Sequence, residues 1–288
     1  DFNRSGLQFD SSSSNTVTGS YISNPPGYGA SIDIGSDGNT ISQSTMTSSN
    51  GSFFALYVHD ANFNTVTGSY ISNPSGVAAK IITNANYNTI SQSTITSIPA
   101  GNYALWINGS SSNTVAGSEI VSGALNTVWL DTNANYNTFS QSAIVNSAGG
   151  SAAFLIYASS ANNVTGSLIS SLSGIALDIR NISNGNTISQ STLTSNAVGL
   201  PALTINAASS SNTVTGSLIS NPAGYGVLLT INANANTISL STMIGGGAGN
   251  AALYINKASS NAIVNSYMQA STAALISGST GTTIGGSW

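Results

Sequence analysis

The hydrophobic residues of this chain recur at fixed places within a short segment that repeats along almost its whole length. Two places after a recurring asparagine the chain carries Val, Ile or Phe, and seven places after it Ile, Leu or Met. Seventeen places after it stands Ile, Leu or Phe, within alternating stretches such as residues 32–34 and 56–58. Period-2 alternation in short runs separated by Gly, Asn and Ser predicts β-strands. No stretch shows the periodicity of an amphipathic helix.

The repeat is marked by two alternating versions of one motif. NTVTGSYIS opens at Asn15 and NTISQSTMT at Asn39, and successive copies lie 24, 25 or 26 residues apart, so that two copies make a unit of about 49 residues. A degenerate last copy starts at Thr282. The recurring asparagines are Asn15, Asn39, Asn64, Asn88, Asn113, Asn137, Asn162, Asn186, Asn212, Asn236 and Asn261.

Short strands at this period predict an all-β fold, a right-handed parallel β-helix (β-solenoid) of about twelve rungs with 24–25 residues each. One rung cannot enclose a core, but stacked rungs bury continuous apolar columns. We expect one solenoid domain over residues 1–288, with a partial first rung at 1–14, a partial last rung at 282–288 and no capping helix. At the usual strand spacing of about 4.8 Å, twelve rungs make a rod ~55–60 Å long.

Two polar columns accompany the apolar ones. The asparagines occupy one turn position in consecutive rungs, where stacked amides can donate and accept hydrogen bonds along the axis. Five places on, every rung carries a serine that we expect to point inward at a corner and to bond the neighbouring rung. These serines are Ser20, Ser44, Ser69, Ser93, Ser118, Ser142, Ser167, Ser191, Ser217, Ser241, Ser266 and Ser287. Both ladders are interpreted as structural.

Composition narrows the possible functions. The chain has 4 Lys+Arg against 8 Asp+Glu, no cysteine and one histidine, His59. Four scattered cations cannot neutralise many phosphates, so nucleic acid is an unsuitable partner. A thiolate metal site is excluded, a histidine-based one lacks a second ligand, and no cofactor is expected. No apolar segment of about 20 residues that could span a bilayer is present. A neutral surface of Ser, Thr, Asn and Gly suits a secreted or cell-surface protein.

The unit N-T-[IV]-x-x-[SN]-x-I, followed by a strand such as GNYALWING, resembles the right-handed parallel β-helix repeat family. The resemblance covers nearly the whole chain. It implies the pectin-lyase-like solenoid fold, which is found in polysaccharide lyases and hydrolases, phage tailspikes and large adhesins. This scaffold hosts many activities, and no catalytic motif of these enzymes is matched, so the resemblance assigns no catalytic residue.

One surface patch is a candidate for chemistry. We take the residues at the seventeenth place as one column, and the outward positions beside them in successive rungs include Tyr57, Trp106, Asp131, Arg180 and Tyr254. Trp129 and Asp178, two residues earlier on their strands, join them. We therefore expect Trp106, Trp129, Asp131, Asp178 and Arg180 to cluster on one face in the middle of the rod. This patch is a candidate glycan-binding or subunit contact, and Asp178 and Arg180 are expected to pair.

A second face carries ranks of outward Thr directly after the asparagines, from Thr16 to Thr283, followed two places on by a mixed Thr/Ser rank. Parallel Thr ranks resemble the ice-binding faces of solenoid antifreeze proteins. Thr also suits exposed strands for purely structural reasons.

The ends of the rod favour self-association. Exposed strand edges invite another chain, and a head-to-tail contact that does not close produces a fibre. Leu7 and Phe9 at one end and Ile284 and Trp288 at the other are the expected contacts. The leading hypothesis is a non-enzymatic extracellular structural protein that stacks head-to-tail into filaments or forms a surface stalk or adhesin. The alternatives are a β-helix that binds or degrades polysaccharide through the Trp/Asp patch, and an ice-binding protein.

Overall fold

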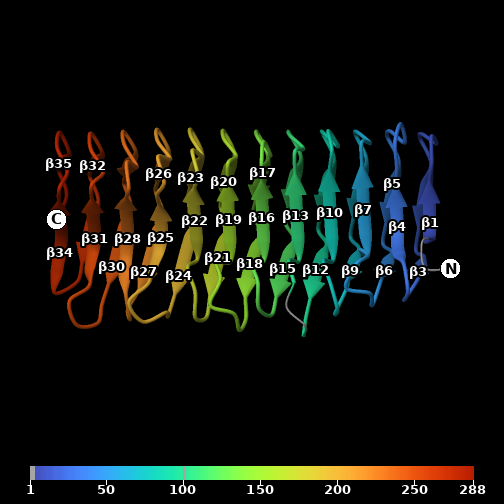
Figure 1. Ribbon diagram of the computed structural model, residues 1–288, viewed down its shortest axis with the longest axis horizontal. Coiled ribbons are helices and arrows are strands. Elements are labelled where there is room, and N and C mark those ends of the chain that lie inside the picture. Colours follow the sequence, from blue (N-terminus) through green and yellow to red (C-terminus); the bar gives the residue numbers. More distant parts are fainter. Residues whose placement is uncertain (1–3, 100–101) are drawn as a thin grey trace.

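The chain folds into a rod of stacked rungs. The computed structural model describes residues 4–99 and 102–288, so residues 1–3 of the predicted partial first rung lie outside the described part. All regular structure in these ranges is β-strand, without a helix, and the strands form three parallel sheets wound as a right-handed solenoid. Figure 1 shows the rungs side by side, with the N- and C-termini at opposite ends of the stack. The predicted fold class is confirmed.

Each rung contributes one strand to each of three sheets, here called A, B and C, except that the last rung has no strand in sheet C. Sheet A contains β1 (Ser5–Phe9), β4 (Tyr28–Ile32), β7 (Leu56–His59), β10 (Ala79–Ile82), β13 (Leu105–Asn108), β16 (Val128–Asp131), β19 (Phe154–Tyr157), β22 (Leu177–Arg180), β25 (Pro201–Ile205), β28 (Tyr225–Thr230), β31 (Ala251–Asn256) and β34 (Thr272–Ser277). Sheet B contains β2 (Thr16–Thr18), β5 (Thr40–Ser42), β8 (Thr65–Thr67), β11 (Thr89–Ser91), β14 (Thr114–Ala116), β17 (Thr138–Ser140), β20 (Asn163–Thr165), β23 (Thr187–Ser189), β26 (Thr213–Thr215), β29 (Thr237–Ser239), β32 (Ala262–Val264) and β35 (Thr283–Gly285). Sheet C contains β3 (Tyr21–Ser23), β6 (Thr45–Thr47), β9 (Tyr70–Ser72), β12 (Thr94–Ser97), β15 (Glu119–Ser122), β18 (Ala143–Asn146), β21 (Leu168–Ser171), β24 (Thr192–Ser195), β27 (Leu218–Asn221), β30 (Thr242–Gly245) and β33 (Tyr267–Gln269).

Apolar columns from all three sheets meet in one continuous core. Ile41 of sheet B, Met46 of sheet C and Ile32 of sheet A are fully buried, and equivalent residues are buried in rung after rung. Where aromatic side chains enter the core they pack edge to face, as Phe139 does on Phe154 with ring centroids 4.8 Å apart. Each rung therefore covers the apolar side chains of the next, which is why no rung encloses the core alone.

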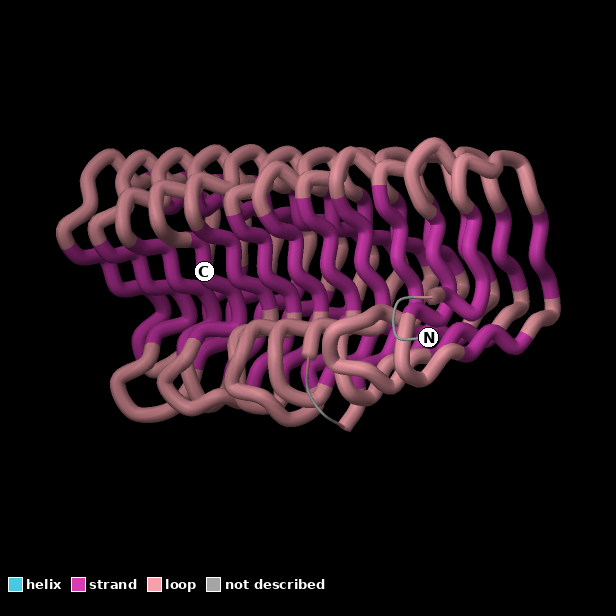
Figure 2. Tube along the Cα trace, turned by 45° about the vertical axis from the view of Figure 1, so that its right-hand side comes forward, coloured by secondary structure: helices cyan, strands magenta, loops and turns pink. Residues whose placement is uncertain are grey.

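The register within sheet A differs from the sequence-based expectation. Ile32 pairs with Val58 rather than with Leu56, because Val58 follows Asn39 by 19 places whereas Ile32 follows Asn15 by 17. The loop between sheets C and A is two residues longer in alternate rungs, and in most of them the return to the next asparagine is one residue shorter, which offsets half of the change. The period of 24–25 residues thus hides a shift of two places. The assumption of one column at the seventeenth place was wrong. Figure 2 shows the varied loops of this edge and the uniform loops of the opposite one.

A left-handed residue makes the tight corner between sheets B and C in each rung. It is mostly glycine in one version of the motif (Gly68, φ 57°) and mostly glutamine in the other (Gln43, φ 47°), with Asn265 and Leu240 as the exceptions. Glycine adopts positive φ without a steric penalty, whereas glutamine needs support from its surroundings. The ladder serine supplies it: Ser44 Oγ donates to the carbonyl oxygen of Ser42 across the corner, at 2.7 Å.

Both polar ladders run along the rod as hydrogen-bonded columns. The backbone N–H and side-chain amide of Asn113 both donate to Oδ1 of Asn137 in the next rung, at 2.9 and 3.1 Å. The N–H of Ser118 donates to Oγ of Ser142 at 3.2 Å. Apart from the first rung, the described ladder asparagines are buried. Buried backbone groups that the turns leave without a strand partner thereby find one in the neighbouring rung.

A second turn ladder was missed in the sequence. It lies two places before each asparagine and runs in the opposite sense, since the N–H of Asn86 donates to Oδ1 of Asn62 in the preceding rung at 2.9 Å. Its members are Ser13, Asp37, Asn62, Asn86, Ser111, Asn135, Ser160, Asn184, Ser210, Asn234, Ser259 and Thr280. The recurrence of Asn, Ser or Asp at that place was the signal that could have shown it.

We predict that Asn137→Ala destabilises the rod by about 2–4 kcal/mol, because it removes the acceptor of two hydrogen bonds and leaves a buried N–H unpaired. Asn15→Ala in the exposed first rung is the matched control, since no rung bonds to its Oδ1 in the same way. Its expected cost is below about 1 kcal/mol. Urea unfolding followed by circular dichroism measures both. Equal losses for the two variants would contradict a role for the buried ladder.

Candidate functional site on the outer face of sheet A

Two columns of side chains cover the outer face of sheet A. The central column, from rung to rung, is Gln8, Ser31, Tyr57, Lys80, Trp106, Trp129, Leu155, Asp178, Thr204, Leu228, Tyr254 and Leu275. The flanking column, two residues further along each strand, includes His59, Ile82, Asn108, Asp131, Tyr157 and Arg180.

The predicted patch is divided between these columns. Tyr57, Trp106, Trp129, Asp178 and Tyr254 share the central column, as the register shows. The other two predicted members stand in the flanking column, where Asp131 lies between Asn108 and Tyr157 and Arg180 follows Tyr157. The expected run of outward residues mixed the two columns, because it assumed a constant loop length.

The two tryptophans form a stack along the rod axis. Their rings lie 5.1 Å apart and 6° from parallel, and Lys80 Nζ sits 3.9 Å above the other face of Trp106. Tyr103 packs against both indoles, with centroid distances of 5.8 and 4.8 Å. Both broad faces of Trp106 are therefore covered by protein. A sugar ring cannot stack on them as the Trp patch was expected to allow, and a ligand on this face would meet ring edges.

Towards the N-terminus the same face continues as an aromatic cluster. The Tyr57 ring lies 5.1 Å from Tyr28 and 5.6 Å from His59, nearly parallel to both. Burial, together with the neighbouring Tyr28 and the Asp33 carboxylate, raises the pKa of Tyr57 to about 12. Burial likewise lowers the pKa of Lys80. These shifts show that side chains on the outside of the sheet shield one another from water.

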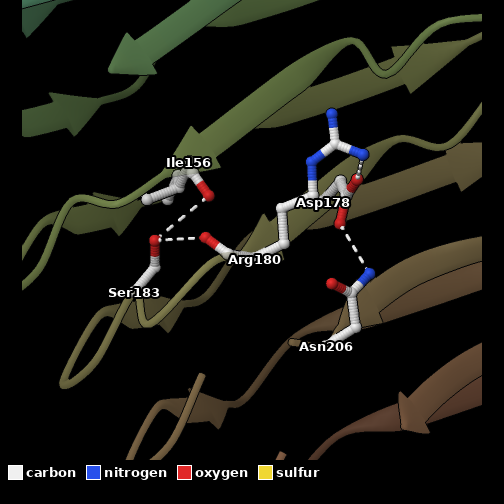
Figure 3. A network of polar contacts seen from close by, with 5 residues as sticks. All are labelled: Ile156, Asp178, Arg180, Ser183 and Asn206. Atoms are coloured by element: carbon white, nitrogen blue, oxygen red, sulfur yellow. Dashed lines mark hydrogen bonds and ion pairs between the residues drawn. The ribbon is translucent and has the colours of Figure 1, made fainter. Parts of the chain in front are cut away.

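Asp178 is the most buried ionisable group of this face. Only 4% of its surface is exposed, and it lies between Leu155 and Thr204 in the column. Arg180 pairs with it at 3.5 Å, as predicted, and Asn206 Nδ2 donates to its other oxygen at 3.4 Å (Figure 3). Burial raises the pKa of Asp178 to about 6, although the Arg180 guanidinium opposes the shift. The carboxyl group thus changes its protonation in mildly acidic solution.

Unpaired polar atoms gather in the same column. In the described part of the chain, five buried side-chain polar atoms lack a hydrogen-bond partner, and three are Trp106 Nε1, Trp129 Nε1 and Thr204 Oγ1. The other two, on Asn261 and Thr282, stand near the last rung, where the asparagine ladder ends. Such atoms are rare because each costs free energy. Their concentration within five consecutive rungs therefore marks this stretch of sheet A.

Other candidate groups have protein partners. Asp131 accepts hydrogen bonds from Asn108 Nδ2 at 3.0 Å and from Thr132 Oγ1 at 2.8 Å. Asp33 accepts from Ser31 Oγ at 2.6 Å. Among the described residues, no group of three or more His, Asp or Glu side chains lies close enough to hold a metal ion.

The Thr ranks lie on the outside of sheet B. In the second rank the hydroxyls pair along the axis: Ser42 Oγ donates to Thr18 Oγ1 and Ser91 Oγ to Thr67 Oγ1, both at 3.0 Å. The same pairing recurs further along the rod. These hydroxyls already satisfy one another, which gives the mixed Thr/Ser rank a structural reason. Ice binding through this face stays a prediction.

The predicted end contacts differ in exposure. Phe9 is 7% exposed and Leu7 is partly buried against the core, whereas Ile284 and Trp288 are 40% and 72% exposed. Exposed Leu275 and Ile276 of β34 lie in the same last rung. The last rung thus exposes several apolar side chains.

Comparison with known proteins identifies the family. The sequence matches the right-handed β-helix region over residues 5–169 and again over 79–243, and the chain belongs to this family. No curated protein sequence matches it. Among solved structures, a variant of the periplasmic alginate epimerase AlgG is 11% identical with a TM-score of 0.60, over 90% of this chain and 75% of that one.

Two further solved structures have the same fold. The Dettilon tailspike protein is 12% identical with a TM-score of 0.67, and the catalytic domain of a GH87 α-1,3-glucanase in complex with tetrasaccharides is 10% identical with a TM-score of 0.52. Each comparison covers 90% of this chain, but only 60% of the tailspike chain and 53% of the glucanase chain. At such identities these similarities establish the fold alone. In the described part of the chain, no helix has the length and apolar character needed to cross a membrane.

We predict that Asp178 makes the protein less stable as pH rises from about 4 to about 6. Its folded-state pKa lies above the ordinary value of 3.8, so the folded chain holds the proton more tightly and the stabilisation is lost as the carboxyl ionises. The change corresponds to about 3 kcal/mol. Urea unfolding at several pH values should show this slope, and Asp178→Asn should remove it. Asp10→Asn, at an exposed carboxylate, should leave it unchanged. A slope that survives in Asp178→Asn would contradict the assignment.

Proposed function

We propose that this β-helix binds a neutral polysaccharide along the outer face of sheet A, without cleaving it. The binding strip runs from Lys80 to Asn206 and contains the tryptophan stack and the Asp178–Arg180 pair. The observation that carries the proposal is the gathering of three unpaired polar atoms in this strip. A ligand rich in hydroxyl groups can accept from the indole N–H groups and bond the Thr204 hydroxyl.

Access to the indole nitrogens requires a local movement. The unpaired atoms are buried, so neighbouring side chains must move before a hydroxyl group can reach them. We infer that Tyr103, which packs against both indoles, is the side chain that turns aside. The free energy regained by pairing buried donors offsets the contacts that Tyr103 gives up. Beyond the stack, the half-exposed guanidinium of Arg180 and the amide of Asn206 offer donors that need no rearrangement.

Charge favours a neutral ligand. The strip and its edge carry Lys80 and Arg180 against Asp131 and Asp178, and the whole chain has a net charge of −4. A polyanion would need an excess of cations over many sugar units, which this surface does not offer. Uncharged sugars can instead hydrogen-bond to amide, hydroxyl and indole groups.

Binding without hydrolysis follows from the position of the carboxylates. Glycosidases place two carboxyl groups about 5–10 Å apart across the scissile bond. Asp131 lies two rungs from Asp178, about 10 Å along the axis, and in the neighbouring column. It is also held by Asn108 and Thr132. Asp178 is a single buried carboxyl group paired with Arg180. Such a pair is better suited to orienting a ligand than to donating or accepting a proton in a cleavage reaction.

The comparisons support a saccharide as the ligand, whereas its neutral character rests on the charge of the strip alone. Two of the proteins with the same fold act on or bind saccharides by their names, one as an alginate epimerase and one as an α-1,3-glucanase with bound tetrasaccharides. The epimerase is periplasmic. We propose that this chain also works outside the cytoplasm. The periplasmic location of the epimerase supports this, as does a composition that is low in charge and rich in hydroxyl groups.

We predict that immobilised neutral polysaccharides retard the protein in affinity electrophoresis, whereas alginate and other polyanions do not. Trp106→Ala should weaken the binding at least about tenfold, because it removes one buried hydrogen-bonding group and the packing of its ring. Tyr87→Ala, at an exposed ring on another edge, is the matched control and should bind as the unaltered chain does. No new reducing ends should appear on prolonged incubation. Absence of retardation by any neutral polysaccharide would refute the proposal.

A second candidate function comes from the last rung. The last rung exposes Ile276, Ile284 and Trp288 beside the outer edges of β34 and β35, which no described strand pairs. We propose that a rung of another copy covers this surface, so that rods join end to end into a filament or surface stalk. Exposed apolar side chains and unpaired strand edges both favour such addition.

For this second candidate, we expect negative-stain micrographs at high protein concentration to show rods longer than one chain. Trp288→Ser and Ile284→Ser together should shorten them, because burial of these side chains drives the contact. Tyr136→Ser, at an exposed ring on the side of the rod and far from both ends, is the control. Isolated rods of uniform length at every concentration would contradict the end-to-end contact.

A further inference from the structure

The outer face of sheet C carries an alternation of large and small side chains that the saccharide proposal does not use. Its first outward position, from rung to rung, is Tyr21, Thr45, Tyr70, Thr94, Glu119, Ala143, Leu168, Thr192, Leu218, Thr242 and Tyr267. We call this the ridge row. Large residues occupy every second rung, and all of them are exposed, from 37% for Leu218 to 75% for Tyr21.

The alternation turns a flat sheet into ridges and furrows. Two rungs span about 9.6 Å, so neighbouring ridges are separated by a furrow one rung wide and floored by Thr or Ala. A second surface with the same spacing fits when its ridges enter these furrows. Another copy of this chain has the same ridge spacing, because the alternation of large and small residues follows the 49-residue repeat of the sequence.

Symmetry selects one arrangement. In a parallel pair related by a two-fold axis along the rods, each rung faces its own equivalent, so ridge meets ridge. In an antiparallel pair whose two-fold axis passes between β15 and β18, every ridge faces a furrow except Tyr267, which lies beyond the end of the second copy. Tyr70 then lies opposite Thr192 of the second copy, Leu218 opposite Thr45, and Glu119 opposite Ala143. Tyr21 and Leu168 similarly meet Thr242 and Thr94.

We propose that two copies of this chain pair side by side and antiparallel through the ridge rows of sheet C. A second row of outward residues lies two places after the ridge row on each strand of sheet C. It supports the same axis, because Val121 of β15 then faces Val145 of β18 in the second copy. These two valines are half-exposed, and they place an apolar contact at the centre of the interface. A shallow pocket of about 230 Å³ opens beside Val145, Ser170 and Thr194, where the second copy would add its Val121 and Thr96.

Charge and area suit a specific but modest association. Glu119 is the one charged side chain in the two outward rows, and the antiparallel pairing sets it against Ala143 rather than against its own copy. Ten paired rungs by four strand residues cover about 45 × 13 Å, or ~600 Å² on each copy. This is at the lower end of the range for specific interfaces, so pairing should depend on concentration.

Cysteine cross-linking distinguishes this geometry from others, since the chain has no cysteine of its own. Thr45→Cys together with Leu218→Cys should give a covalent dimer when the full chain is treated with a bismaleimide that spans about 10 Å, the usual distance between packed sheets. Within one chain these positions lie seven rungs apart, about 34 Å, and cannot bridge. Thr40→Cys with Thr213→Cys, equally far apart but on sheet B, is the control and should stay monomeric. Cross-linking by Thr45→Cys alone would indicate a parallel pair and overturn the proposal.

A swap of ridge and furrow tests the complementarity itself. Tyr70→Thr should weaken pairing by about tenfold and Thr192→Tyr by at least as much, through a lost contact and a clash. The two changes combined should restore pairing to within about threefold of the unaltered chain. Sedimentation velocity measures pairing, and thermal unfolding checks that the variants fold. Monomeric rods at all concentrations, or a double variant no better than the singles, would refute the interface. End-to-end filaments would not produce the Thr45–Leu218 cross-link.

Discussion

Every rung of this solenoid must match the hydrogen-bonding groups and the side-chain packing of the rungs above and below it. The rest of the structure depends on that constraint. Neighbouring strands lie about 4.8 Å apart, so a side chain faces its own column mate at contact distance. Amides and hydroxyls can donate to one neighbour and accept from the other, as Asn113 and Asn137 do. Like charges in the same position would repel. The low charge of the chain and its wealth of Asn, Ser and Thr are consequences of stacking.

The same constraint shapes the surface. On sheet A, equal stacking distances bring Trp106 and Trp129 face to face and place Lys80 over the stack. The rings then shield each other, and the outside of the sheet acquires a second apolar layer. Asp178 is buried in this layer with Arg180 as its counter-ion. The tryptophans that suggest a binding patch in the sequence therefore pack largely against their neighbours. The unpaired donors mark where the hydrogen bonding of this layer is incomplete.

The fold could be predicted from the sequence because the same pattern is repeated many times. Some eleven copies of one apolar pattern define the strands, and the ladder asparagines mark the turns. The site was harder to predict, since its columns depend on loop lengths that alternate from rung to rung. Two compensating changes, one before sheet A and one after it, leave the period of the asparagines nearly constant. The spacing of Asn15 and Asn39 could not show that Asp131 leaves the column of Trp106.

By itself the sequence determined the strand-rich rung, the parallel stack, the core columns and the asparagine ladder, because each follows from residue type at a fixed period. Only the tertiary structure decided which outward side chains share a column, that both faces of the Trp106 ring are covered, and that Asp178 is buried on an outer face. These properties depend on distances between residues of different rungs. Loop geometry sets those distances, and periodicity in one dimension does not contain it.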